Sequence, residues 1–278
     1  MSTQNALLTI LVEKINNDTL VLPTLPAIAL KVRKAADDPD INLNAMGDVI
    51  GQDPSLTARI IKISNSAYLG RAVKVTSINQ AVTRIGLRQI KNIATALAME
   101  QLFVSKNDLV GQYMKREWGN TINVVANALA TLQMYTKSTK NRELSLDTMT
   151  LAALVHNIGV LPILTEAERH EEVFANPTFL DDAIDKVSGR IGASIMNVWG
   201  FDKGFIDVTE HWKDLAFIPD KVSYIDFVRV GAALSGRMDS QKDAVMNLAV
   251  QRGVVQNVSD LDSADFIEAR ESGKQIFA

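Results

Sequence analysis

The 278-residue chain contains no cysteine, and this absence excludes several kinds of protein. Without a thiol there is no disulfide scaffold, no thiolate metal site and no cysteine nucleophile. A cysteine-free chain suits a reducing compartment, so we predict a cytoplasmic location. Proline and glycine are also scarce, with seven and 15 residues, which argues against a loop-rich all-β chain.

A targeting signal is also missing from the first residues. Residues 1–5 contain no Lys or Arg, and Glu13 and Lys14 interrupt the apolar run that follows. A secretory signal has a basic start and an unbroken apolar segment. We therefore expect no signal peptide at the start of this sequence.

Neither sign of charge dominates, because 29 Lys and Arg face 32 Asp and Glu and the formal net charge is −3. This balance argues against a globally basic nucleic-acid binder. Hydrophobic residues make up 47% of the chain, which is enough for a large buried core. The length corresponds to about one or two domains.

Two uncharged windows, 118–136 and 148–165, have the length of membrane spans. Both contain polar or helix-breaking residues, namely Asn120, Asn123, Asn127 and Gln133 in the first and His156, Asn157, Gly159 and Pro162 in the second. Such residues are costly in lipid. We interpret both windows as buried core helices and expect no membrane association.

Helical spacing and helix-end signals recur along almost the whole chain. Asp53 can cap a helix that starts at Pro54, Ser77 can cap the next, and Gly86 can end it. Thr165 and Glu168 have the spacing of a capping box. Only residues 72–76 alternate like a strand. The fold class is therefore all-α, with further helices predicted over 5–16, 26–37, 87–103, 108–137, 147–157, 178–187, 190–198, 203–213, 219–236, 240–252 and 263–272.

Charge is unevenly distributed between the two halves. Residues 54–99 contain no acidic side chain and seven basic ones, whereas residues 166–214 contain 11 acidic and five basic ones. The basic stretch suits an acidic partner, a phosphate, the acidic half itself, or simply a solvated surface. It holds a single aromatic residue, Tyr68, and so lacks a surface on which nucleic-acid bases could stack.

Five short blocks follow one another in the first part of the chain, namely Leu22–Pro26, Asp53–Thr57, Ile63–Tyr68, Ser77–Val82 and Ile85–Leu87. In this order and spacing they resemble those of the HDOD domain, a bacterial signalling module related to the HD metal-dependent phosphohydrolases. The resemblance covers about residues 20–215. It implies an N-terminal HDOD bundle over 1–105, a degenerate HD-like helical core over 106–236 and a C-terminal helical tail over 237–278.

The resemblance also implies a degraded metal site. HD phosphohydrolases bind one or two metals through an early His, a His-Asp pair and a later Asp. Here His156 is retained, Asn157 replaces the Asp, and Asn120 stands in for the early His. The later Asp corresponds to Gly231 or Ala232, and a common His-His pair is reduced to His211. We therefore expect no catalytic residue and no cofactor, and a vestigial pocket formed by His156, Asn157, Asn120 and His211.

The residues themselves leave several roles open. His156 is either a buried structural imidazole or a residual ligand, and His211 is either a surface residue or a pocket partner of His156. His170, within a charged run, is interpreted as solvated. The segment with Ser64, Asn65, Ser66 and Tyr68 caps a helix or forms a recognition surface. The basic residues predicted to join that surface are Arg59, Lys62, Arg84 and Arg88.

The leading hypothesis is a non-catalytic bacterial signal-transduction module that binds signalling proteins or a small ligand such as a nucleotide. The alternative is a divergent metal-dependent phosphohydrolase acting on a nucleotide or phosphate ester. Under that alternative His156 and His211 would hold Mn, Fe, Zn or Mg. A third hypothesis is an RNA or cyclic-nucleotide binder that uses the basic residues of 59–91.

Overall fold

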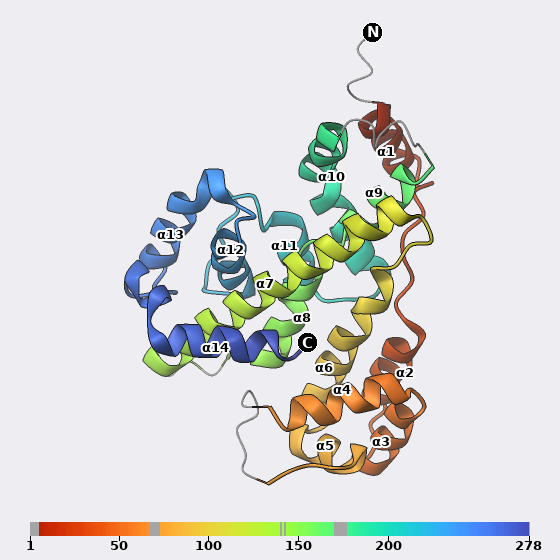
Figure 1. Ribbon diagram of the computed structural model, residues 1–278, viewed down its shortest axis with the longest axis vertical. Helices are drawn as coiled ribbons and strands as arrows, with labels where there is room; N and C mark the ends of the chain where they lie inside the picture. The colour runs from red at the N-terminus through yellow and green to blue at the C-terminus, as the bar shows by residue number, and fades with distance from the viewer. Residues whose placement is uncertain (1–5, 67–72, 140, 142, 170–176, 278) are drawn as a thin grey trace. The chain divides into compact units, whose positions relative to one another are not determined.

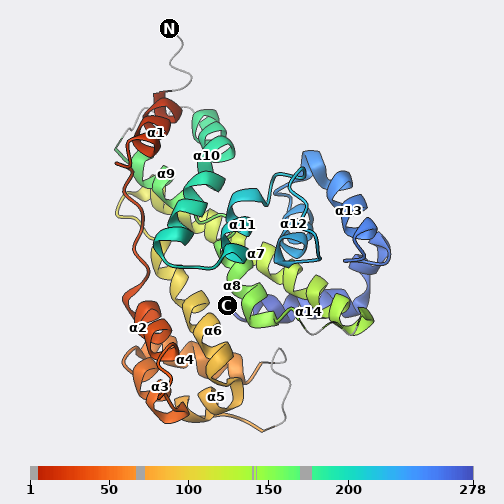
Figure 2. The same ribbon diagram turned by 180° about the vertical axis from the view of Figure 1, so that it is seen from behind.

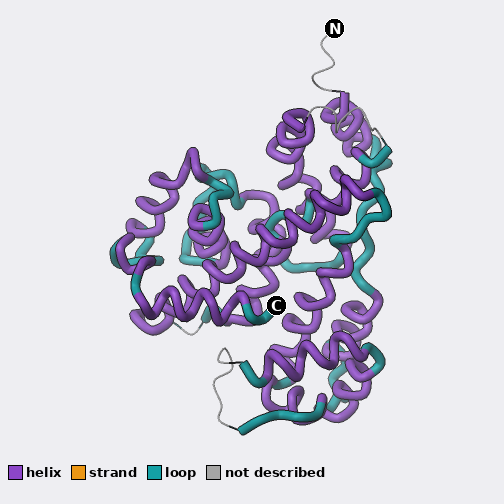
Figure 3. The backbone as a smooth tube through the Cα atoms, viewed as in Figure 1, coloured by secondary structure: helices purple, strands orange, loops and turns teal. Residues whose placement is uncertain are grey.

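A computed structural model describes residues 6–66, 73–139, 141, 143–169 and 177–277. Within these residues the chain consists of helices joined by loops, without a β-strand, which confirms the predicted all-α class (Figure 1, Figure 3). The α-helices are α1 (Ala6–Asn16), α2 (Ala27–Ala36), α3 (Leu43–Gly51), α4 (Pro54–Ser64), α5 (Ile78–Ile85), α6 (Leu87–Ala98), α7 (Asp108–Thr139), α8 (Leu146–Val155), α9 (Val160–Ala167), α10 (Pro177–Val198), α11 (Lys203–His211), α12 (Tyr224–Leu234), α13 (Lys242–Gln251) and α14 (Ala264–Lys274).

Several helix ends follow directly from local sequence signals. The Asp53 carboxylate accepts a hydrogen bond from the Leu56 N–H at 2.9 Å, and Pro54 opens α4. Ser77 caps α5 in the same way through the Gln80 N–H. Gly86 ends α5 with a φ of 89°, a left-handed conformation that glycine adopts without strain. These caps confirm the predictions made for the three positions.

Two local predictions were wrong because tertiary packing outweighed them. Thr165 lies inside α9 instead of capping a new helix, since α9 starts at Val160 and buries its apolar face. The helices predicted over 178–187 and 190–198 are one continuous helix, α10. Gly189 does not break α10, because the missing Cβ allows the backbone of α11 to approach closely.

Residue contacts divide the chain into two units, each assembled from three separate stretches. The first contains residues 1–24, 101–121 and 155–218, and the second contains 25–100, 122–154 and 219–278. The three contiguous segments predicted from the family resemblance are a different division and stay a prediction.

The first unit is built around α10, which packs along α11 and α9 and is covered by α1 (Figure 2). Lys14 near the end of α1 forms an ion pair with the buried carboxylate of Glu166 in α9 at 2.5 Å. Arg190 of α10 donates a hydrogen bond to the Asn16 side chain at 3.3 Å. These two contacts attach α1 to both helices beneath it.

The second unit contains the bundle α2–α6, in which α2 packs on α6 and α3 on α5. It also contains α12, which lies against the second half of α7. A Cβ added at Gly231 would lie 2.6 Å from the carbonyl oxygen of Val124, so only glycine allows this approach. The rings of Tyr135 and Phe227 meet edge-on at 5.3 Å at the same helix pair.

The stretch Leu146–Ala167 is long and apolar enough to cross a membrane by length and composition. Its most apolar window has a mean hydropathy of 1.5, and 89% of that window is buried inside the structure. Core helices of folded proteins have the same properties, so the composition of this stretch is weak support for a span.

Candidate functional site

The His-Asn pair singled out in the sequence lies in the turn between α8 and α9. The side chains of His156 and Asn157 are both buried, with 2% and 4% of their surface exposed. The imidazole of His156 meets the indole of Trp212 edge-on, with ring centroids 4.8 Å apart. His156 therefore contributes to an aromatic contact in the interior of the first unit.

A buried carboxylate connects the two predicted asparagines. The Nδ2 group of Asn157 donates to Glu117 Oε2 at 3.1 Å, and Nδ2 of Asn120 lies 3.5 Å from Glu117 Oε1. Glu117 is itself 3% exposed, and Arg116 Nε lies 3.8 Å from its Oε1 atom. The structure thus brings Asn157 and Asn120 together at the two oxygen atoms of one carboxylate.

Sequence reasoning did not single out Glu117. The residue stands in a charged run after Lys115 and Arg116, which reads as a solvated face. The available signal was its position three residues before Asn120, because side chains at this spacing share one face of a helix.

One polar atom of this cluster has no hydrogen-bond partner among the described residues. It is the Oδ1 atom of Asn157, whose amide nitrogen is turned toward Glu117. A buried acceptor without a donor is costly. The cluster is consequently a polar interior site with unused acceptor capacity.

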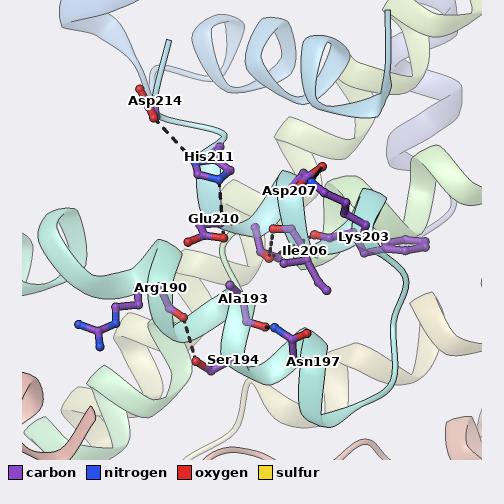
Figure 4. Close-up of polar contacts among 12 residues, drawn as sticks. Arg190, Ala193, Ser194, Asn197, Lys203, Ile206, Asp207, Glu210, His211 and Asp214 are labelled. Carbon is purple, nitrogen blue, oxygen red and sulfur yellow. Dashed lines mark hydrogen bonds and ion pairs between the residues drawn. The ribbon is translucent and has the colours of Figure 1, made fainter. Parts of the chain in front are cut away.

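His211 has different surroundings from those of His156. Its Nε2 lies 3.6 Å from Glu210 Oε2 and its Nδ1 lies 3.7 Å from Asp214 Oδ2, as Figure 4 shows. The ring stacks on Phe217 at 4.1 Å and is partly exposed. Trp212, the residue after His211, makes the ring contact with His156. The pairing of His156 with His211 stays a prediction.

Gly159, the last residue of the turn that begins with His156 and Asn157, sets the position of that turn. A Cβ at Gly159 would lie 1.9 Å from the Ser188 carbonyl oxygen and 2.6 Å from the Gly192 nitrogen. A Cβ at Gly189 would lie 2.6 Å from the Glu210 carbonyl oxygen. The absence of side chains therefore allows α10 to touch both the turn and α11.

The donor set does not fit the metal site of an HD phosphohydrolase. No group of three or more His, Asp or Glu side chains in the described part of the chain is placed to hold a metal ion. Asn157 directs its amide nitrogen, which donates hydrogen bonds and cannot ligate a cation, at the carboxylate of Glu117. The resemblance places the later aspartate at Gly231 or Ala232, and at Gly231 even a Cβ would collide with Val124.

The predicted recognition segment in the second unit forms the base of a loop. Asn65, the C-cap of α4, donates to the Val75 carbonyl at 2.8 Å and accepts from the Val75 N–H at 2.7 Å. Ser64 and Ser66 donate to carbonyls of α4 at 2.8 and 2.7 Å. These contacts are those expected of the capping role.

The basic residues assigned to that surface divide into two groups. Arg84 donates to the carbonyls of Ser64 and Val73, and Arg59 donates to the Leu97 carbonyl and pairs with Glu100 at 2.8 Å. Lys62 and Arg88 have exposed side chains. Tyr68 and His170, also singled out in the sequence, lie outside the described residues.

Comparison with protein families identifies a match to the HDOD domain over residues 22–215. A crystal structure from Shewanella amazonensis SB2B is 42% identical and covers 100% of both chains, with a TM-score of 0.94. That protein is assigned provisionally to the metal-dependent phosphohydrolases.

More distant structures share the fold. An HDOD domain protein of unknown function from Geobacter sulfurreducens is 19% identical, with a TM-score of 0.65 and coverage of 96% and 97% of the two chains. In addition, a Treponema pallidum (strain Nichols) protein is 26% identical over 211 residues. This match covers 72% of the present chain and 39% of the Treponema protein, so the chain spans well under half of that relative.

Proposed function

Because the chain belongs to the HDOD domain family, we propose that it is a non-catalytic bacterial regulatory module that binds a signalling protein or a small ligand. Modules of this kind transmit a state by contact and need no reacting group. The cysteine-free composition supports a cytoplasmic location for this activity.

The contact between Asn157 and Glu117 is the observation that carries the proposal. In an HD phosphohydrolase an aspartate at this position would bring a second negative charge, which a metal offsets. Here the Asn157 amide carries no charge, and it donates a hydrogen bond to the buried Glu117 carboxylate at 3.1 Å. We therefore expect hydrogen bonds within the protein to stabilise this interior without a metal.

A divergent metal-dependent phosphohydrolase is the second candidate function. The provisional assignment of the 42% identical Shewanella protein supports it. Under this alternative His156 and His211 are the protein ligands, and the substrate is a nucleotide or phosphate ester.

Metal content separates the two candidates. The purified full chain would be equilibrated with Mn²⁺, Fe²⁺ or Zn²⁺, desalted and analysed for metal, and phosphate release from a nucleotide panel would be measured in parallel. We expect no retained metal and no Mn²⁺-dependent release. Near-stoichiometric metal, with phosphate release that is lost in His156→Ala but kept in Ser194→Ala, would establish the enzyme instead. Ser194 is a suitable control because its side chain is exposed.

A further inference from the structure

A groove in the second unit lies beside the base of the loop between α4 and α5. It is an open depression of about 470 Å³ and not an enclosed cavity. It combines residues that follow the loop with residues on the outer face of α5, namely Val73, Lys74, Val75, Asn79, Gln80, Thr83 and Arg84.

The walls of the groove are held in place by hydrogen bonds. Asn65 binds both backbone groups of Val75, and Arg84 donates to the carbonyls of Ser64 and Val73. The Gln80 side chain accepts from the Thr76 N–H at 2.9 Å. A surface already ordered in this way loses little entropy when it binds a partner.

Several positive charges of this region have no carboxylate partner in the part of the chain that the structure describes. Lys74 and Arg88 are exposed and have no hydrogen-bond or ion-pair partner among the residues that the structure describes. Arg84 bonds to neutral carbonyls instead of a carboxylate. By contrast, Arg59 and Lys91 of the same acid-free stretch pair with Glu100 and Asp37.

An exposed apolar side chain stands next to these cations. Val73 has 75% of its surface exposed, so its methyl groups are available for an apolar contact beside the groove. An aliphatic anchor flanked by uncompensated cations complements a peptide that carries both carboxylates and an apolar side chain. No aromatic side chain on which nucleic-acid bases could stack is among the described residues that line the groove.

We propose that this groove binds an acidic segment of a partner protein, with carboxylates on Lys74 and Arg84 and an apolar side chain on Val73. The proposal rests on the proposed function as a binding module and names the surface that would perform it. Lys74 supplies an exposed positive charge, and Arg84 also holds the wall in place through its hydrogen bonds to Ser64 and Val73.

Selection from a random peptide library displayed on phage, with the full-length chain as target, tests the proposal. We expect enriched peptides to be rich in Asp and Glu and to contain an aliphatic or aromatic residue. Their affinity should fall about ten-fold or more in Lys74→Glu, because the variant places like charges together, and should fall as salt is added. Lys242→Glu is the matched control, since this lysine is also exposed in the second unit, and its effect should stay within about two-fold.

Three results would overturn the proposal: no enriched peptide, enriched peptides without acidic residues, or equal binding by wild type and Lys74→Glu. A labelled oligouridylate that binds more tightly than the peptides and is lost in Lys74→Glu would assign the groove to RNA instead. Failure of the groove leaves the metal and phosphate assays unaffected. A Mn²⁺-dependent phosphohydrolase would overturn the proposed function whatever the peptides show.

Discussion

At the scale of the residue, asparagine in place of aspartate at the buried position 157, next to His156, changes the charge of the site. The Asn157 amide donates a hydrogen bond to the carboxylate of Glu117, which is only 3% exposed and is therefore shielded from water. A carboxylate at position 157 would repel Glu117 unless a cation stood between them. The asparagine thus makes the site stable as a hydrogen-bonded cluster.

Asn157→Asp is therefore expected to lower the free energy of unfolding by about 2–4 kcal/mol in metal-free buffer, because it buries a second carboxylate beside Glu117. Mn²⁺ should restore part of this loss in the variant and have no effect on the wild type. Urea unfolding with and without Mn²⁺ measures both effects. The exposed Asn17 provides the control Asn17→Asp, which should change stability by less than about 0.5 kcal/mol. An unchanged Asn157→Asp variant would mean that Glu117 does not depend on the amide.

Asn65 has a structural role that can be measured separately from recognition. Asn65→Ala removes two hydrogen bonds to Val75 and one to the Ile61 carbonyl, so we expect a loss of about 2 kcal/mol. Ser66→Ala removes a single bond and should cost about 0.5–1 kcal/mol. Chemical denaturation compares the two. Equal effects would contradict the interpretation that the hydrogen bonds between Asn65 and Val75 stabilise the protein at this position.

At the scale of the element, glycine determines how closely helices approach in the first unit. The turn before α9 touches the backbone of α10 at Ser188 and Gly192, and α10 in turn touches the backbone of α11 at Glu210. Backbone atoms cannot move aside as the end of a flexible side chain can. These contacts therefore constrain the turn that carries His156 and Asn157.

Gly159→Ala is expected to destabilise the protein by more than about 3 kcal/mol, because the new Cβ would lie 1.9 Å from a carbonyl oxygen. Gly119 provides the matched control, since it is exposed within α7 and a Cβ there meets nothing within 4 Å. Gly119→Ala should stabilise the protein by about 0.5–1 kcal/mol through its higher helix propensity. Thermal unfolding of both variants checks the prediction, and a mild effect of Gly159→Ala would show that α10 can shift.

At the scale of the whole molecule, stability comes from apolar interiors and from ion pairs within each unit, including Lys14 with Glu166 in the first and Arg252 with Asp226 in the second. Neither pair involves a group of three metal-ligating side chains. Because the described residues hold no such group, we expect folding of the chain not to depend on a cation, in contrast to proteins whose metal contributes to folding.

The midpoint of thermal unfolding should accordingly be the same in EDTA and in Mn²⁺ or Zn²⁺. A ligand that binds only the folded state raises the free energy of unfolding, by about 2.7 kcal/mol at a hundred-fold excess over its dissociation constant. The midpoint of thermal unfolding rises with it. Differential scanning fluorimetry of the full chain measures this. A clear rise with one metal that is absent in His156→Ala would indicate a working metal site.

Local signals predicted much of the fold. Asp53, Ser77 and Gly86 act where their short-range chemistry places them, because a cap involves only neighbouring residues. The merger of two predicted helices into α10 was missed, because glycine weakens an isolated helix but improves packing between helices. The sequence singled out Asn157 and Asn120, which meet at Glu117, but it missed Glu117 itself because burial cannot be read from a charged run. The pocket predicted from His156, Asn157, Asn120 and His211 stays a prediction.

The all-α class, the helix ends at Asp53, Ser77 and Gly86 and the loss of the family's aspartate at position 157 are determined by the sequence alone, since each depends on residue identity and local spacing. Tertiary structure decided which groups meet. It placed Glu117 between two asparagines, Trp212 against His156, and Arg84 across the base of a loop. Contacts between residues far apart in the chain depend on how closely helices pack, which no local pattern specifies.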